Sequence, residues 1–223
     1  FSCFCPVCIE KMREKGIDVE KLKIYIEQSF EKLESNPLEI EKYKNFRYKF
    51  KNKEMNQYFQ FKNDSIVEKI NEIIDFFKTK GLEVGLDTYA SDISYLFGQD
   101  IIRLNQKADF IKPMYYRRTY APAGIPFEIQ TFKKMYNKEA GEFLLKIIGE
   151  EDLKDNIGKK QMTEEVKYLS KNLENIFLGI DFNRKENIAL SDEEYIKEVF
   201  DILEEGDSKG IVLSWDLMSI PEE

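Results

Sequence analysis

The stretch that decides the fold is Asn175-Ile176-Phe177-Leu178-Gly179-Ile180-Asp181-Phe182. A strand that is buried on both faces has a continuous apolar run rather than an alternation, and such strands are typical of parallel sheets. The run Gly210-Ile211-Val212-Leu213-Ser214-Trp215-Asp216 has the same character. Earlier in the chain, residues 82–90 and 108–116 are predicted as two further strands. The sequence therefore predicts an α/β protein with four parallel strands.

Helical patterns fill most of the intervals between these strands. They cover residues 9–15, 18–34, 92–106, about 126–148 and 163–173. We expect Asn63-Asp64-Ser65 to cap a helix that ends at Lys80-Gly81, and Ser191-x-x-Glu194 to form a capping box for a helix that ends at Glu205. Residues 38–61 are aromatic and basic, and we interpret them as helical. Crossover helices between strands are typical of a parallel sheet.

Each predicted strand ends in polar or aromatic residues. In a TIM barrel the active-site residues lie at these C-terminal strand ends. No glycine-rich phosphate loop follows any strand, which disfavours a doubly wound dinucleotide-binding sheet. We therefore expect the C-terminal half of a TIM (β/α)8 barrel, with about four parallel strands and covering helices. Residues 1–223 would form one domain, with a cysteine loop and helical segment over 1–62 and four βα-type units over 63–223.

Four strands of a barrel leave two sheet edges and an apolar inner face uncovered. A complete barrel has eight strands in about 250 residues. The stretch Phe1-Ser2-Cys3-Phe4-Cys5 reads as a loop that leaves an earlier strand. We therefore expect an N-terminal half-barrel or self-association to cover the inner face.

Composition excludes several kinds of chemistry. The chain has 34 basic and 42 acidic residues, a formal net charge of −8, and no histidine. Ser-His-Asp and Cys-His catalysis and histidine metal ligands are therefore excluded. Lys and Arg alternate with Glu along helices, so we expect solvated faces and no nucleic-acid partner. No apolar run is long enough to cross a membrane, and we expect a cytoplasmic protein.

The cysteine loop Cys3-x-Cys5-x-x-Cys8 is the strongest chemical motif. Thiolates at this spacing can converge on one metal ion, and structural zinc has four ligands. The chain has three cysteines in all. A carboxylate, water or a residue from another part of the protein would have to supply the fourth ligand. The alternative is three reduced thiols that pack as small apolar groups, and an iron–sulfur cluster usually has more cysteines.

With these motifs placed, the chain resembles a group of uncharacterised TIM-barrel proteins that are classed as glycoside hydrolases. The resemblance is carried by Cys3-x-Cys5-x-x-Cys8, Gly98-Gln99-Asp100, Ala108-Asp109-Phe110-Ile111-Lys112-Pro113-Met114-Tyr115-Tyr116 and Pro122-Ala123-Gly124. The cysteine loop is also similar to that of the family 42 β-galactosidases, where a CxCxxC loop after strand four binds zinc with a further cysteine. The resemblance implies a barrel that faces a saccharide.

The resemblance also implies positions for the catalytic residues. Retaining barrel glycosidases of this kind have the acid/base Glu at the end of strand four and the nucleophile Glu at the end of strand seven. The end of strand four would lie at or before Phe1, and the predicted strand seven ends in Asp181 rather than Glu. The resemblance therefore leaves hydrolysis open.

Asp181, Asp216 and Asp87 are the candidate catalytic carboxylates at the strand ends. Glycoside hydrolysis uses two carboxyl groups about 5–5.5 Å apart for retention or about 6.5–9.5 Å apart for inversion. Asp181 with Asp216 is the favoured pair, and Asp87 with Asp181 is a second feasible pair. The alternative is that each Asp caps a helix or pairs with Lys112 or Arg117.

Four aromatic residues and two cations are candidate substrate-binding residues. Sugar rings stack on aromatic faces, although aromatic residues also fill cores. Lys112 ends an apolar strand and needs an acidic partner or a ligand oxygen, and a Schiff-base role is a weaker alternative. The candidates are Tyr89, Tyr115, Tyr116, Trp215, Lys112 and Arg117.

Three functions therefore remain open. The first is a glycoside hydrolase-like barrel that acts on or binds a carbohydrate and that is inactive as this chain alone. The second is a non-catalytic carbohydrate-binding or scaffold barrel with a structural metal bound by cysteines. The third is an enzyme whose cysteine-bound metal is catalytic. The cysteines precede the first helix instead of lining strand ends, which favours a structural ion.

Overall fold

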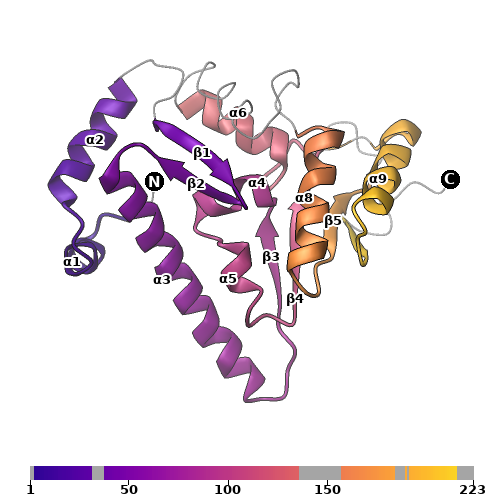
Figure 1. Cartoon of the computed structure of the whole chain (residues 1–223), viewed down its shortest axis with the longest axis horizontal. Helices are drawn as coiled ribbons and strands as arrows, with labels where there is room; N and C mark the ends of the chain where they lie inside the picture. Colours follow the sequence, from indigo (N-terminus) through magenta and orange to yellow (C-terminus); the bar gives the residue numbers. More distant parts are fainter. Residues whose placement is uncertain (1–2, 32–37, 136–156, 184–188, 190, 215–223) are drawn as a thin grey trace.

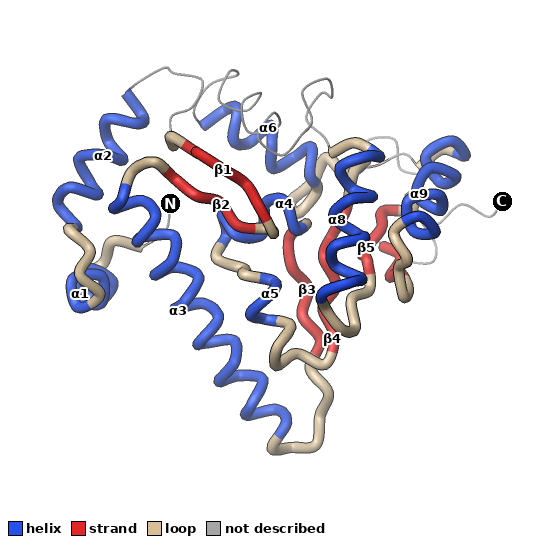
Figure 2. Tube along the Cα trace, in the orientation of Figure 1, coloured by secondary structure: helices blue, strands red, loops and turns tan. Residues whose placement is uncertain are grey.

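The computed structural model describes residues 3–31, 38–135, 157–183, 189 and 191–214 (Figures 1 and 2). Its helices are α1 (Pro6–Glu14), α2 (Val19–Glu31), α3 (Lys53–Lys78), α4 (Ser91–Ser94), α5 (Ile101–Leu104), α6 (Ile125–Met135), α8 (Lys159–Asn172) and α9 (Glu193–Glu205), with a 3-10 turn η1 (Tyr95–Phe97). Its strands are β1 (Ile40–Lys44), β2 (Arg47–Phe50), β3 (Gly85–Tyr89), β4 (Phe110–Tyr115), β5 (Leu178–Asp181) and β6 (Ile211–Ser214).

The four predicted strands form one parallel sheet, which confirms the α/β class. The strand order is β3-β4-β5-β6, the same as the order along the chain. Crossovers between parallel strands are right-handed, so a sheet wound in one direction carries its crossover helices on one face. Helices α8 and α9 pack against each other beside this sheet (Figure 1). A doubly wound sheet would reverse its strand order, and this one does not.

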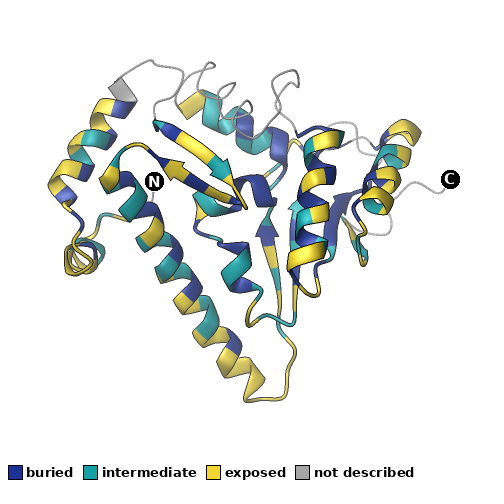
Figure 3. Cartoon of the chain, in the orientation of Figure 1, coloured by how far each residue is buried: buried dark blue, intermediate teal, exposed yellow. Residues whose placement is uncertain are grey.

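Burial is uneven over the sheet, because β5 is buried along its length whereas β3 carries exposed residues (Figure 3). On the covered face, Ile111 and Tyr115 of β4 lie beside Leu178 and Ile180 of β5, and all four are almost fully buried. The opposite face, which we call the open face, carries the residues that alternate with them. Val212 there is 38% exposed, but Leu213, on the covered face of the same strand, is 39% exposed, and Asp181, on the open face of β5, is fully buried. Among the described residues, the covered face therefore holds the larger part of the apolar core, and exposed residues lie on the outer strands β3 and β6.

The prediction that residues 38–61 are helical is wrong for the first part of that range, whereas residues 53–61 do belong to helix α3. Strands β1 and β2 pair antiparallel as a hairpin, with Tyr43 opposite Tyr48. Aromatic residues favour strands, and here they alternate with charged residues at a period of two. The turn residues Asn45 and Phe46 have φ angles of 52° and 61°, as a tight hairpin turn requires. Asparagine adopts this conformation readily, whereas phenylalanine does so rarely.

The predicted helix caps at residues 63–65 and 191–194 also need correction. Helix α3 begins at Lys53, where the Asn52 side chain accepts a hydrogen bond from the Met55 N–H, so residues 63–65 lie inside the helix. Helix α9 is capped by Asp192, one residue beyond the expected Ser191. At α9 the predicted and observed caps are adjacent residues, whereas the cap of α3 lies eleven residues before Asn63.

The helix predicted over residues 92–106 is broken into α4, η1 and α5. Gly98 has a φ of 86° and ends η1, and Asp100 then caps α5. Helix α8 begins at Lys159, before the predicted start at residue 163. Helix α6 is described as far as Met135, and the remainder of the helix predicted to about residue 148 lies outside the described residues.

One hydrophobic core joins the N-terminal elements to the sheet. Buried residues of α1, α2 and the hairpin belong to the same cluster as those of β4, β5 and α8; examples are Met12, Leu22, Phe50, Ile111 and Leu169. None of the described helices is both long enough and apolar enough to span a membrane.

The turn of the hairpin gives a stability prediction. The Phe46 ring is buried and meets the Tyr168 ring edge to face at a centroid distance of 5.0 Å. Phe46→Ala should lower the free energy of unfolding by about 3 kcal/mol, because a buried ring is lost. Asn45→Gly, at the exposed neighbouring position of the same turn, should change it by less than about 1 kcal/mol. Urea unfolding of both variants measures this, and equal effects would contradict the described packing.

Candidate functional site

The three cysteines converge at the N-terminus of α1. Cys5 is the residue before the helix, Pro6 begins it, and Cys8 lies in its first turn. The three sulfur atoms lie within 4.8 Å of one another. The Cys5 N–H donates to the Cys3 Sγ at 3.3 Å, which orders the loop. All three are free thiols, and Cys3 and Cys5 are exposed.

The N-terminus of α1 and the neighbouring thiols give Cys5 and Cys8 different pKa values. The backbone N–H of Cys8, and then the Cys3 thiol, lower the pKa of Cys5 to about 7. Hydrogen bonds with Cys3 and Cys5 raise the pKa of Cys8 to about 11. The first negative charge of the group therefore falls on Cys5, where the helix N-terminus favours a thiolate. Three thiols at these positions could hold one metal ion.

The cysteine loop is fixed to the core on both sides. The Phe4 ring stacks on the Tyr58 ring of α3 at 5.9 Å, with an interplanar angle of 11°. Cys8 is partly buried and packs against the core, and Met12 of the next turn is fully buried. The relative positions of the sulfur atoms are thus set by packing as well as by the loop.

The open face of the sheet carries an ion pair between Lys112 and Asp87. The two residues are register partners on β4 and β3, and Lys112 Nζ lies 2.8 Å from Asp87 Oδ2. The Lys112 side chain is 15% exposed. Burial lowers the pKa of Lys112, but hydrogen bonds with Asp87 and Tyr116 outweigh it, so the net shift is upward. A lysine held protonated is a poor Schiff-base nucleophile, so the salt bridge is the interpretation that the geometry favours.

Tyr89 is held at the end of β3 by the Gly98-Gln99-Asp100 motif. Its ring stacks on Phe97 at 4.0 Å, and its backbone N–H donates to the Gln99 side chain at 2.8 Å. The ring is only partly buried. Tyr116, at the end of β4, is buried. Of these two candidate stacking residues, Tyr89 is therefore the more accessible.

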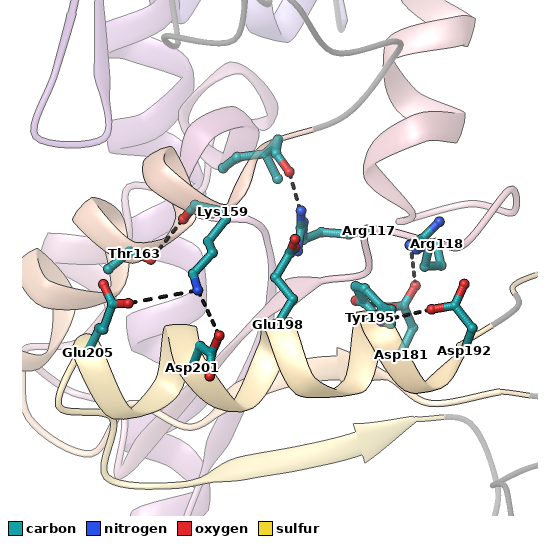
Figure 4. Close-up of polar contacts among 11 residues, drawn as sticks. Arg117, Arg118, Lys159, Thr163, Asp181, Asp192, Tyr195, Glu198, Asp201 and Glu205 are labelled. Atoms are coloured by element: carbon teal, nitrogen blue, oxygen red, sulfur yellow. Dashed lines mark hydrogen bonds and ion pairs between the residues drawn. The ribbon is translucent and has the colours of Figure 1, made fainter.

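Asp181 lies at the end of β5 and is fully buried (Figure 4). One carboxylate oxygen accepts from the Arg118 N–H at 2.7 Å and the Thr119 hydroxyl at 2.9 Å, and the other accepts from the Tyr195 hydroxyl at 2.5 Å. Burial raises the pKa of Asp181, and these donors oppose the shift. The carboxylate thus fixes the loop after β4 to α9.

Arg117 points into the helix layer. Its Nε donates to the Ile157 carbonyl at 2.8 Å, and its Nη1 pairs with Glu198 of α9 at 2.5 Å (Figure 4). The Arg117 and Arg118 guanidinium groups both lie over the Tyr195 ring. Arg117 therefore supports the loop that reaches Asp181.

The structure does not bring Asp87 and Asp181 together. Asp87 is level with Lys112 of β4, whereas the pairing of Tyr115 with Ile180 puts Asp181 level with Tyr116. Two strands of separation and four residues of offset place their Cα atoms about 16 Å apart. Both side chains would have to point directly at each other to approach the span of a glycosidase carboxyl pair, and the Asp181 carboxylate is instead held by the loop after β4 and by α9. Asp216 and Trp215 lie outside the described residues, so the pair of Asp181 with Asp216 stays a prediction.

A second buried carboxylate was not predicted. Glu165 of α8 accepts from the Tyr43 hydroxyl at 3.0 Å, from the Gln161 amide at 2.9 Å and from the Tyr115 hydroxyl at 2.8 Å. The Ser91 hydroxyl also donates to it. Tyr115 was predicted to stack on a sugar, but it is fully buried and its hydroxyl is bonded to Glu165. The signal in the sequence is a glutamate inside the apolar stripe of Met162, Val166 and Leu169.

Comparison with known proteins identifies no relative. No protein-family model matches the chain, and no curated protein or solved structure matches it either. The functional argument therefore depends on the geometry of the residues themselves.

The Glu165 network gives a prediction about pH. Burial raises the pKa of Glu165 above its ordinary value, and its four donors only partly offset this. The raised pKa contributes stability that is complete below the ordinary Glu pKa and is lost as the pH rises through the folded-state value. Relative to Glu165→Gln, the natural protein should therefore lose stability between mildly acidic and neutral pH.

Urea unfolding of both proteins across that pH range measures the difference. Glu164→Gln is the matched control, because Glu164 is an exposed neighbour on the same helix. Its difference from the natural protein should not vary with pH. A constant difference for Glu165→Gln would contradict the upward shift.

Proposed function

We propose that this protein holds a structural metal ion, with zinc as the preferred ion, through Cys3, Cys5 and Cys8. The observation that carries this is the convergence of three thiol sulfurs within 4.8 Å on a loop anchored to the core. Thiolates are ligands of zinc, whose bonds to sulfur are about 2.3 Å long. Three sulfur atoms around one ion at that bond length lie about 3.7–4 Å apart in a tetrahedral site.

The position of the thiols favours a structural ion over a catalytic one. They lie before and within α1, and no residue of the parallel sheet belongs to the group. A catalytic zinc has an open position facing a substrate site. The ion would instead join the loop to the first turn of α1, and its fourth ligand would be a residue outside the group of three cysteines.

Cobalt(II) titration tests this proposal, because thiolate–cobalt charge-transfer absorption reports sulfur ligands directly. One equivalent of cobalt should bind and be displaced by zinc. Each of Cys3→Ser, Cys5→Ser and Cys8→Ser should weaken binding by more than about tenfold, since even outer-shell changes cost that much. Glu10→Gln, at an exposed acid on the same helix, should leave it unchanged. Binding that survives loss of all three thiols would refute the proposal.

As a second candidate function, we infer that the open face of the sheet binds a carbohydrate without hydrolysing it. The sequential order of the four parallel strands supports the further proposal that they are part of a (β/α)-barrel, whose ligands bind at the C-terminal strand ends. Asp87, Lys112 and the partly exposed Tyr89 ring would contact the sugar. The engagement of Asp181 by three donors, and its distance from Asp87, argue against a catalytic pair.

A panel of neutral oligosaccharides and aryl glycosides tests this second function. We expect weak binding that Asp87→Asn lowers about tenfold, because a sugar hydroxyl loses a charged acceptor. We expect no hydrolysis of the aryl glycosides. Glu83→Gln, an exposed acid just before β3, is the control. Hydrolysis that Asp181→Asn abolishes would contradict the non-catalytic assignment, and unchanged affinity in Asp87→Asn would contradict the binding face.

A further inference from the structure

A polar cleft lies between the hairpin, α3, η1 and α5. Its volume is about 430 Å³, which is within the range of small-molecule sites. None of its lining residues belongs to the parallel sheet or to the cysteine loop. The lining residues are Arg47, Asn56, Gln60, Asn63, Asp64, Tyr95, Asp100 and Arg103.

The charges of this cleft cancel within its own walls. Arg47 binds Asp100 through Nε at 3.0 Å and Nη2 at 2.7 Å. Arg103 pairs with Asp64. Two cations and two anions thus neutralise each other, and an ionic ligand would have to compete with an existing pair. A neutral ligand can use the remaining N–H groups and lone pairs without breaking either pair.

One wall of the cleft presents a buried acceptor without a donor. The Asn63 side chain is 1% exposed, and its Nδ2 donates to the Phe59 carbonyl at 2.8 Å and to the Tyr95 carbonyl at 3.1 Å. These two bonds fix which end of the amide is oxygen. The Asn63 Oδ1 has no partner in the part of the chain that the structure describes. A buried acceptor left unpaired is costly. Because this oxygen has almost no solvent-accessible surface, a ligand donor reaches it only after a shift of the Asn63 side chain.

The Tyr95 side chain supplies a second group for a ligand. Burial raises the pKa of its hydroxyl, with Asp100 adding to the rise and Arg47 and Arg103 opposing it. Tyr95 therefore lies within the field of both ion pairs. Gln60, which is exposed at the rim, adds an amide that can donate and accept.

We propose that this cleft binds a small neutral molecule that is rich in hydroxyl groups. A hydroxyl group donates and accepts at once, so it can pair with the Gln60 amide or the Tyr95 hydroxyl while it also accepts from an arginine N–H that neither ion pair uses. It brings no charge that would disturb the Arg47–Asp100 and Arg103–Asp64 pairs. The site shares no residue with the cysteine loop or the open face, so it stands or fails independently of the functions proposed above.

Nuclear magnetic resonance of the full chain labelled with ¹⁵N tests the site directly. The probes are D-glucose and myo-inositol as neutral polyols, glycine as a zwitterion and sulfate as an anion. We expect both polyols, at millimolar concentrations, to shift the Asn63 side-chain amide and the backbone signals of Asp100 and Arg103. Glycine and sulfate should not shift them.

Single-group variants then locate the binding. Tyr95→Phe removes one hydroxyl and Gln60→Ala removes the rim amide, and each should weaken polyol binding by about tenfold. Gln106→Ala is the matched control, because Gln106 is an exposed glutamine outside the cleft. Asn63→Ala is unsuitable as a test because it also removes the bonds to Phe59 and Tyr95.

Three outcomes would overturn the proposal. The first is the absence of any shift with both polyols. The second is a response to glycine or sulfate in place of the polyols, which would assign a charged ligand. The third is a polyol response confined to Asp87 and Lys112, which would support the open face as the binding site and refute the cleft.

Discussion

The arrangement of this protein depends on the one-directional winding of its parallel sheet. Because β3, β4, β5 and β6 lie side by side in chain order, the right-handed crossovers carry their helices to one face. That face holds the fully buried Ile111, Tyr115 and Ile180. The other face is left with Asp87, Lys112 and the exposed Val212. The apolar core and the Lys112–Asp87 ion pair thus lie on opposite sides of the same strands.

The buried Glu165 carboxylate connects this sheet to the N-terminal elements. It accepts from Tyr43 of the hairpin and from Tyr115 of the sheet, while it belongs to α8. The hairpin in turn borders the polar cleft, and α3 supports the cysteine loop through the stacking of Tyr58 on Phe4. Helix α3 therefore borders both the polar cleft and the cysteine loop, and the Glu165 network joins the hairpin to the sheet.

The sequence predicts those features that follow from local burial and chain spacing. The runs around Leu178–Asp181 and Ile211–Ser214 are apolar, and the structure confirms them as parallel strands. The residues of β5 are buried on both sides, whereas Val212 and Leu213 of β6 are exposed. The three cysteines are close in sequence, so their convergence is also predictable. The hairpin was missed because its turn is Asn45-Phe46 rather than a glycine turn, so no turn signal separates its two strands. Asp181 and Asp87 lie at comparable positions in the sequence pattern, but their offset depends on strand register, which local sequence does not reveal.

The central claim is that the apolar core lies on the face of Ile111 and Ile180, and paramagnetic relaxation tests it most directly. A soluble paramagnetic agent broadens the signals of side-chain methyl groups that solvent can reach. The account predicts strong broadening for Val212 on the open face, broadening also for Leu213 because β6 is the outer strand of the described sheet, and none for Ile111 and Ile180 on the covered face. Equal protection of Val212, Ile111 and Ile180 would contradict this placement of the core and the binding face that depends on it.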